Sequence, residues 1–255
     1  MIGWIDPGVV VAGFVVGVLV GATGIGSGSL MAPLLIFVFG RSPLIAVGSD
    51  LAYSAITKIV GAAQHLRLGT VDRRLAVLLA IGSVPAGLAG VAVTAVLEQR
   101  SLQLANGLTA QLLGAVLLLV AAVVLLDPIV GGRWRSRAPL AAPALIALGA
   151  LVGLLVGLTS LGSGALLAPI LVLTTQLPYR RVVGTDIAHA ALLTTAAATV
   201  HVAAGHIDVP LVASLLAGSV PGVVIGSRMM VRLPQPILRA TLGAVLAISG
   251  LRLVI

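Results

Sequence analysis

Long apolar stretches separated by short polar segments run along the whole chain of 255 residues. Six of these stretches have roughly the 20-residue length of a membrane-spanning helix. They cover residues 43–65, 74–96, 102–126, 180–202, 210–231 and 236–255. The other two, Val9–Phe39 and Leu145–Thr175, are longer and have glycine- and serine-rich middles. An unbroken helix of about 31 residues would measure roughly 46 Å, against a hydrocarbon core of about 30 Å. We therefore predict that each long stretch breaks at its glycines, as a re-entrant hairpin or as two short crossings.

The two halves of the chain repeat one another at a fixed offset of 136 residues. The segment Gly21–Pro33, GATGIGSGSLMAP, corresponds to Gly157–Pro169, GLTSLGSGALLAP. The same offset pairs several polar residues and prolines: Asp50 with Asp186, His65 with His201, Asp72 with Asp208, and Pro85 with Pro221. Repeated halves are typical of membrane transporters. We predict a first membrane repeat over 1–126 and a second over 141–255, joined by a basic linker at 127–140.

The arginines distinguish two topologies for these repeats. If each long stretch crossed the membrane once, seven arginines would lie on each side, which is no bias. If each long stretch returned to the side where it began, the halves would be inverted and the arginines would divide eleven against three. The larger group would be Arg67, Arg73, Arg74, Arg133, Arg135, Arg137, Arg180, Arg181, Arg228, Arg232 and Arg239. Because cytoplasmic loops carry an excess of basic residues, we predict inverted repeats in the cytoplasmic (inner) membrane. Both termini would lie outside and the linker in the cytoplasm.

The composition agrees with a membrane protein and argues against other classes. Hydrophobic residues make up 59% of the chain and charged residues 9%, whereas about a quarter of a soluble domain is charged. The predicted fold class is an all-α polytopic membrane protein with two inverted repeats, each a broken or re-entrant opening helix pair plus three transmembrane helices. The net charge of +8 does not indicate nucleic acid, because the arginines lie at the ends of apolar runs with almost no aromatic neighbours. The chain has no cysteine, and nothing in it indicates a cofactor or a metal.

The glycine- and serine-rich breaks are the first candidate site, for a substrate. A helix that begins at the membrane midplane exposes backbone N–H groups and the positive end of its dipole, both of which suit an anion. We expect such half-helices to begin near Ser27 and Ser163. The alternative is close helix packing through small residues. The substrate-binding candidates from these motifs are Thr23, Gly26, Ser27, Gly28, Ser29, Thr159, Gly162, Ser163 and Gly164.

Charged residues inside predicted spans are the second group of candidates. Asp50 and Asp186 each lie about seven residues into a span, and a carboxylate inside a membrane is functional by default. They could take a proton in a coupled cycle, or they could cap a broken helix. Lys58 is the only lysine and lies two helical turns after Asp50. It could neutralise a bound anion, and its alternative is an ion pair with Asp50 or Asp186.

The histidines are the third group. His65 and His201 correspond across the repeat, and His189 follows Asp186 by three residues on the same helix face. All three are candidates for proton relay, with a satisfied or interfacial histidine as the alternative. His206 falls in a predicted loop. No nucleotide-binding, hydrolase or metalloprotease motif is present, so we do not expect an enzyme.

The motifs in both halves resemble the TauE/SafE family, also called the sulfite exporter or 4-toluenesulfonate uptake permease (TSUP) family. The resemblance rests on the glycine-rich motif that ends in Ala-Pro, the Val-Gly-(Ser/Thr)-Asp element and the His-x-x-x-Gly-x-x-Asp stretch, and it covers essentially residues 8–255. It implies secondary transport of an organosulfur compound or oxyanion. Family members tend to carry Asn where this chain has Asp50 and Asp186, and the family pattern assigns no role to Lys58.

The predicted function is therefore alternating-access transport of a small anion such as sulfite or a sulfonate like sulfoacetate, coupled to protons through the aspartates. The predicted partners are this anion and the lipid bilayer, with no nucleic acid and with a homodimer as one allowed assembly. One alternative is a channel or a cation carrier that uses Asp50 and Asp186 as ligands. Another is a membrane-embedded enzyme or an assembly partner.

Overall fold

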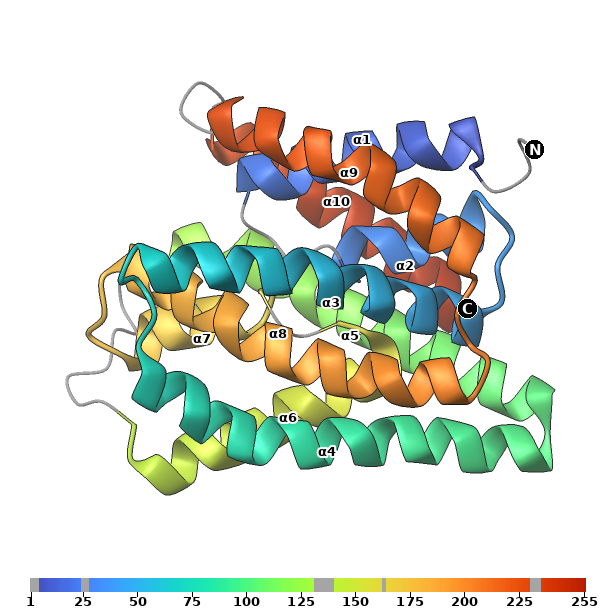
Figure 1. The fold of residues 1–255 in the computed structure, drawn as a ribbon, viewed down its shortest axis with the longest axis horizontal. Coiled ribbons are helices and arrows are strands. Elements are labelled where there is room, and N and C mark those ends of the chain that lie inside the picture. Colours follow the sequence, from blue (N-terminus) through green and yellow to red (C-terminus); the bar gives the residue numbers. More distant parts are fainter. Residues whose placement is uncertain (1–4, 24–27, 131–139, 162–163, 230–234) are drawn as a thin grey trace.

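The computed structural model describes residues 5–23, 28–130, 140–161, 164–229 and 235–255. Within these ranges the chain forms ten α-helices and no strand (Figure 1). The helices are α1 (Pro7–Thr23), α2 (Gly28–Phe37), α3 (Pro43–Arg67), α4 (Arg73–Arg100), α5 (Leu102–Val130), α6 (Ala142–Thr159), α7 (Leu167–Thr174), α8 (Tyr179–Ala203), α9 (Val209–Met229) and α10 (Gln235–Val254). The all-helical fold agrees with the prediction from the apolar pattern.

Several helices are long and apolar enough to cross a membrane. By length and composition, four described segments qualify, and they are Pro43–Arg67, Arg73–Arg100, Leu102–Leu125 and Ala142–Thr159. Large apolar side chains in mid-helix point outward, including Val60 at 66% exposure and Leu151 at 58%. A soluble protein would bury such residues, whereas a lipid-facing surface requires them. The chain is a polytopic membrane protein.

Both long opening stretches are broken where the glycines predicted it. In the first, α1 ends at Thr23 and α2 begins at Gly28; in the second, α6 ends at Thr159 and α7 begins at Leu167. The expected helix start near Ser163 is therefore wrong, because the regular helix begins four residues later. Ser160 (φ 61°) and Gly164 (φ 82°) adopt left-handed conformations, which a right-handed helix cannot contain.

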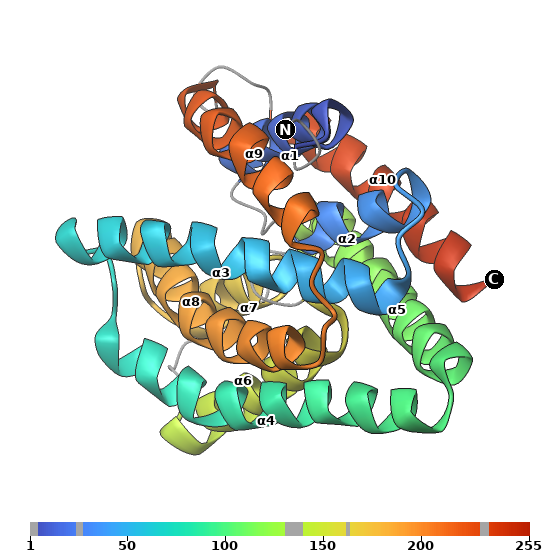
Figure 2. The same cartoon turned by 45° about the vertical axis from the view of Figure 1, so that its right-hand side comes forward.

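Two pairs of parallel helices form the opposite edges of the molecule. In Figures 1 and 2, α1 and α9 lie side by side at one edge and α4 and α6 at the other, with α3 and α8 between them. The pairs are equivalent under the repeat: Gly17 of α1 abuts the backbone of Ser219 in α9, and Gly153 of α6 abuts the backbone of Ser83 in α4. A Cβ atom at either glycine would overlap a backbone atom of the partner helix. Each half of the chain therefore packs its opening helix against the other half.

The equivalent helices α3 and α8 run antiparallel to each other. Gly48, near the start of α3, contacts the backbone of His206, just beyond the end of α8. Gly184, near the start of α8, contacts the backbone of Thr70, just beyond the end of α3. These two contacts correspond under the offset of 136, so the structure has an approximate two-fold relation between its halves.

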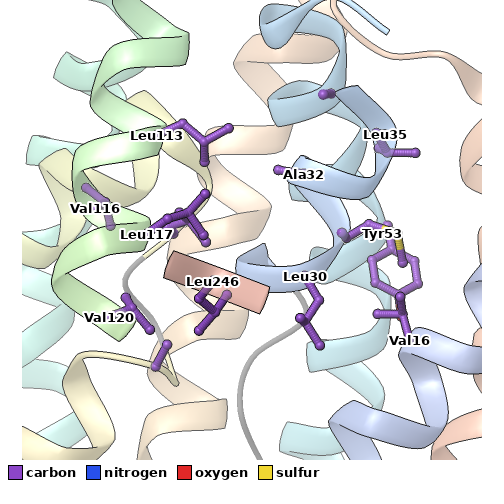
Figure 3. Close-up of a cluster of buried hydrophobic side chains, with 14 of the residues drawn as sticks. Val16, Leu30, Ala32, Leu35, Tyr53, Leu113, Val116, Leu117, Val120 and Leu246 are labelled. Carbon is purple, nitrogen blue, oxygen red and sulfur yellow. The ribbon is translucent and has the colours of Figure 1, made fainter. Parts of the chain in front are cut away.

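An apolar core joins the short helix α2 to the longer helices around it. Figure 3 shows Leu113, Leu117 and Val120 of α5 on the side that faces α2, which presents Ala32 to them. Leu246 of α10, which is fully buried, packs in the same cluster. This packing holds α2 inside the bundle, so that its N-terminal end lies among other helices rather than in lipid.

The helix ends and the connections between helices lie on two opposite sides of the molecule (Figure 1). On the first, called the terminal side here, lie the start of α1, the end of α10 and the α2–α3, α4–α5 and α8–α9 connections. On the second, called the linker side, lie the α3–α4 and α7–α8 connections, the end of α5 and the start of α6.

Candidate functional site

The structure describes the predicted substrate-binding residues only in part. Gly26, Ser27, Gly162 and Ser163 lie outside the described residues, and of Thr23 only the backbone is described. Gly28 and Ser29 begin α2 and are buried. Thr159 is fully buried, and its hydroxyl donates to the Leu155 carbonyl (2.7 Å) while accepting from the Leu161 amide (3.2 Å). Both hydrogen bonds of this hydroxyl are therefore made to the backbone at the end of α6, and its proton is already donated to Leu155.

The breaks of the two repeats meet at the start of α2. An ideal Cβ on Gly28 would lie 2.6 Å from the Ser160 carbonyl oxygen and 3.1 Å from Oδ2 of Asp50. Only glycine allows the second repeat's break to approach the first helix turn of α2 this closely. The contact brings the N-terminus of one half-helix, the end of α6 and a carboxylate into a single region.

Asp50 is fully buried in α3, and its carboxylate lacks ordinary hydrogen bonds. The Ser160 hydroxyl lies near it, yet neither group makes a hydrogen bond of normal distance and angle with any described residue. A buried carboxylate without ordinary hydrogen bonds is costly in any protein and more so in a membrane. Such a group indicates a functional site, because packing alone gives no reason to retain it.

Asp186 occupies the equivalent position in the second repeat and is held differently. Its carboxylate interacts with the backbone of Gly164, in the turn before α7, while Oδ1 has no partner among the described residues. Asp186 thus contacts the turn before α7 of its own repeat, and the two predicted uses of these carboxylates, proton uptake and helix capping, stay predictions. The two aspartates are equivalent in sequence and different in their contacts.

Lys58 lies within electrostatic range of both carboxylates. It interacts with Asp186 across the α3–α8 interface, and with Asp50 two turns back along α3. The predicted association of Lys58 with the aspartates is therefore present. With both carboxylates ionised, this group of three side chains carries one excess negative charge.

Polar pairs flank the charged group on two equivalent sides. Nε2 of His189 lies 2.7 Å from the Ser83 hydroxyl of α4, and both residues are fully buried. At the equivalent positions, Tyr53 of α3 interacts with Ser219 of α9. His189 was predicted from the sequence and Tyr53 was not, because a tyrosine and a histidine at equivalent positions do not form a repeated motif.

The remaining histidines lie near opposite ends of α3 and α8. Nδ1 of His65 is 2.8 Å from the Thr70 hydroxyl on the linker side. On the terminal side, Nδ1 of His201 is 3.1 Å from Nδ1 of His206, whose Nε2 is 2.6 Å from Oε2 of Glu98. Glu98 was not singled out from the sequence, although it is the only glutamate in the chain. Among the described residues no group of three or more His, Cys, Asp or Glu could hold a metal ion.

A sequence profile of the family described as sulfite exporter TauE/SafE matches residues 9–253. The probable membrane transporter protein YjnA of Bacillus subtilis (strain 168) is 38% identical over 252 residues, which cover 96% of this chain and 98% of that protein. The probable membrane transporter proteins YdhB and YunE of the same organism are 25% and 23% identical, and each alignment covers at least 94% of both chains. No solved structure matches this chain.

Proposed function

Because this chain belongs to the sulfite exporter TauE/SafE family, we propose that it is a secondary transporter that moves a small anion across the cytoplasmic membrane by alternating access. Sulfite and sulfonates such as sulfoacetate are the first substrates to test, since the family is described as sulfite exporters. The relatives' names, which describe probable membrane transporters, support the transport part of the proposal.

The observation that carries this proposal is the meeting of the two helix breaks. Gly28 begins α2 against Ser160 at the end of α6, and beside them lies the buried carboxylate of Asp50, which makes no hydrogen bond of ordinary geometry. A helix N-terminus inside the bilayer offers backbone N–H donors and a positive dipole end, which suit an anion. Broken helices at the interface of two repeats are the usual substrate sites of secondary transporters.

Proton coupling follows from the charges around this region. Two ionised carboxylates would repel an incoming anion, and at low dielectric the repulsion is large. A proton taken up by one carboxylate removes an obstacle to anion binding, so anion and proton would bind together. We assign the proton to Asp50, because no ordinary hydrogen bond occupies either of its oxygens. Lys58 then balances the remaining carboxylate, Asp186.

The alternation of access is proposed to come from the relation between the two halves. The antiparallel α3 and α8, with reciprocal contacts at Gly48 and Gly184, support inverted repeats over 1–126 and 141–255. Rocking one repeat against the other would open the site first to one side and then to the other. Since Arg67, Arg73 and Arg181 lie on the linker side, the positive-inside rule supports a cytoplasmic linker and external termini.

The test is transport by the purified protein in liposomes. Uptake of labelled sulfite, sulfoacetate and other oxyanions is measured with and without a pH gradient, against protein-free liposomes. Asp50→Asn should abolish acceleration by the pH gradient and keep sulfite–sulfite exchange. The matched control is Asp6→Asn, which removes an exposed carboxylate at the start of α1 and should behave as wild type. Gradient-driven uptake that survives Asp50→Asn excludes Asp50 as the coupling residue.

A second candidate function is cation transport with Asp50 and Asp186 as ligands. The observation that favours it is the excess negative charge of the two carboxylates and Lys58. The same liposomes decide between the two: sodium, potassium and divalent cations are tested in place of the anions. Cation flux that is abolished by both Asp50→Asn and Asp186→Asn, with no flux of any anion, would replace the first proposal.

A further inference from the structure

Three titratable side chains from separate parts of the chain form a continuous contact chain on the terminal side. Glu98 lies in the last turn of α4, His206 in the α8–α9 connection, and His201 in the last turn of α8. Oε2 of Glu98 is 2.6 Å from Nε2 of His206, and Nδ1 of His206 is 3.1 Å from Nδ1 of His201. The side chain of Glu98 is 33% exposed, that of His206 is 4% exposed, and His201 is fully buried. The chain of contacts therefore leads from the surface into the bundle.

The inner end of this chain points toward the helix break. Nε2 of His201 makes no hydrogen bond of ordinary geometry with a described residue, and it faces the backbone of Gly157 in α6. Three residues further along the chain is Ser160, whose hydroxyl is also unpartnered and lies near the carboxylate of Asp50. One helical turn of α6 thus separates the last imidazole from the region assigned to the substrate.

Another charged pair in this region does not involve the histidines. Asp208, in the same connection as His206, pairs with Arg41 of the α2–α3 connection at 3.1 Å. From α3, the neighbour of His206 is the backbone of Gly48, which carries no charge. The side chain that faces the imidazole of His206 from α4 is Glu98, and the one from α8 is His201.

The first repeat shows that the fold does not need this chain of contacts. Its equivalent turn has the same left-handed glycine, Gly69 (φ 64°) for Gly205 (φ 75°). There the position of His206 is taken by Thr70, whose hydroxyl lies 2.8 Å from His65. A threonine is thus sufficient to close the turn onto the equivalent histidine. The second repeat places a titratable imidazole at this position and adds a carboxylate from α4.

We propose that Glu98, His206 and His201 conduct protons between the terminal side and the helix break beside Asp50, an inference that rests on the proposed proton-coupled transport. Glu98 passes its proton to Nε2 of His206, and His206 releases the proton of Nδ1 to Nδ1 of His201. The Ser160 hydroxyl then takes up the proton on Nε2 of His201 as it gives its own proton to the carboxylate of Asp50. Each imidazole gains one proton and loses one, and exchange of the ring tautomers restores the starting state. Among the described residues, His65 on the linker side contacts the Thr70 hydroxyl instead of a second titratable group, so this relay serves the terminal side.

The variants are His206→Thr and Glu98→Gln. His206→Thr installs the residue that the first repeat uses in the equivalent turn, so the turn is expected to fold. The matched control is Arg100→Gln, which removes one charge from the end of the same helix. In liposomes that contain a pH-sensitive dye, proton movement driven by a sulfite gradient should fall roughly tenfold or more in both variants. Sulfite–sulfite exchange at equal pH should stay within about twofold of wild type, because exchange requires no net proton movement.

The outcomes separate the relay from a structural clamp. Loss of exchange together with proton movement would show that the contacts only hold the connection to α4, and unchanged proton movement would show that the path is idle; both overturn the proposal. Wild-type protein that moves sulfite without protons refutes coupling and the relay together, whereas wild-type protein that moves no sulfite refutes only the substrate.

A measurement without substrate tests the relay even if the wild-type protein moves no sulfite. The protein is labelled with ¹⁵N-histidine in lipid nanodiscs, and the His201 signal is assigned with a His201→Gln variant. His201 is fully buried, and the relay requires its proton to move between the two ring nitrogens, so its ¹⁵N signals should report both neutral tautomers. Glu98→Gln should change the ratio of the two tautomers, and Arg100→Gln should not. A wild-type His201 that holds a single tautomer overturns the relay.

Discussion

The backbone amide of Asp208, at the start of α9, donates a 3.0 Å hydrogen bond to the hydroxyl of Ser49 in α3, 159 residues earlier in the chain. The equivalent bond in the other half runs from the amide of Asp72, at the start of α4, to the hydroxyl of Thr185 in α8, at 2.9 Å. Ser49 and Thr185 immediately precede the two buried aspartates. Each repeat therefore ties a helix start of the other repeat to the residue beside its own carboxylate.

Loss of one of these ties should lower stability. Ser49→Ala or Thr185→Ala removes the acceptor of a helix-start amide, and a hydrogen bond of this kind contributes about 1 kcal/mol. Thermal unfolding in detergent should show a lower midpoint for both variants. Thr199→Ala is the control, because its hydroxyl bonds only within its own helix and is exposed. A midpoint drop in Thr199→Ala equal to that in Ser49→Ala would contradict the assignment.

The edge pair α4–α6 should tolerate no side chain at Gly153. A Cβ there would overlap the backbone of Ser83, and helices must separate to relieve such an overlap. We expect Gly153→Val to destabilise the protein by about 3 kcal/mol or more, since overpacking of this size is costly. Gly107→Ala in α5 is the control, as nothing lies within 4 Å of its Cβ position. Equal yields and unfolding midpoints for the two variants would exclude close packing as the reason for Gly153.

Lys58 should stabilise the folded protein by compensating the charge of Asp186. Lys58→Thr, which installs the residue of the other repeat, leaves two buried carboxylates without a cation, and breaking a buried pair costs roughly 3 kcal/mol or more. Asp186→Asn in the same chain should restore much of that loss. The unfolding midpoints of the two single variants and the double variant form a thermodynamic cycle. Additive effects in that cycle would mean that the two side chains do not interact.

Arg41 and Arg181 should lie on opposite sides of the membrane. Both side chains are 45% exposed, and each pairs with the helix-start aspartate of the other repeat, Arg41 with Asp208 and Arg181 with Asp72. The chain has no cysteine, so Arg41→Cys and Arg181→Cys each introduce a single thiol. An impermeant maleimide added to intact cells should label Arg41→Cys only. Labelling of both from the same side would rule out inverted repeats.

The apolar spans could be predicted from the sequence because membrane burial acts on each segment separately. The predicted spans 43–65 and 180–202 became α3 (Pro43–Arg67) and α8 (Tyr179–Ala203), with ends a few residues away. The breaks in the opening stretches could also be predicted, because glycines interrupt apolar segments that are too long for one membrane-spanning helix. The start of α7 was not, because the left-handed Ser160 and Gly164 delay the helix and depend on contacts with other helices.

Some polar residues of the terminal-side contact chain could be predicted from the sequence, and others only from the structure. His201 was found through its repeat partner, whereas Glu98 and His206 gained meaning only once α4 was packed beside the α8–α9 connection. A side-chain contact between residues 108 positions apart produces no pattern in the sequence from which it could be predicted. Tyr53 was missed for a related reason, since it corresponds to a residue of another type.

By itself, the sequence determined that this is a duplicated, all-helical membrane protein with two glycine-rich breaks and charged residues inside its spans. Those properties follow from hydropathy and from the repeat offset, which are local or one-dimensional. Only the tertiary structure decided that Gly28 meets Ser160 beside Asp50, that Asp186 reaches the turn at Gly164, and that Lys58 lies within range of both carboxylates. The contact of Gly28 with Ser160 and that of Lys58 with Asp186 depend on how the two halves pack, and the contact of Asp186 with Gly164 depends on how α8 packs against the turn before α7, because all these residues are far apart in the chain.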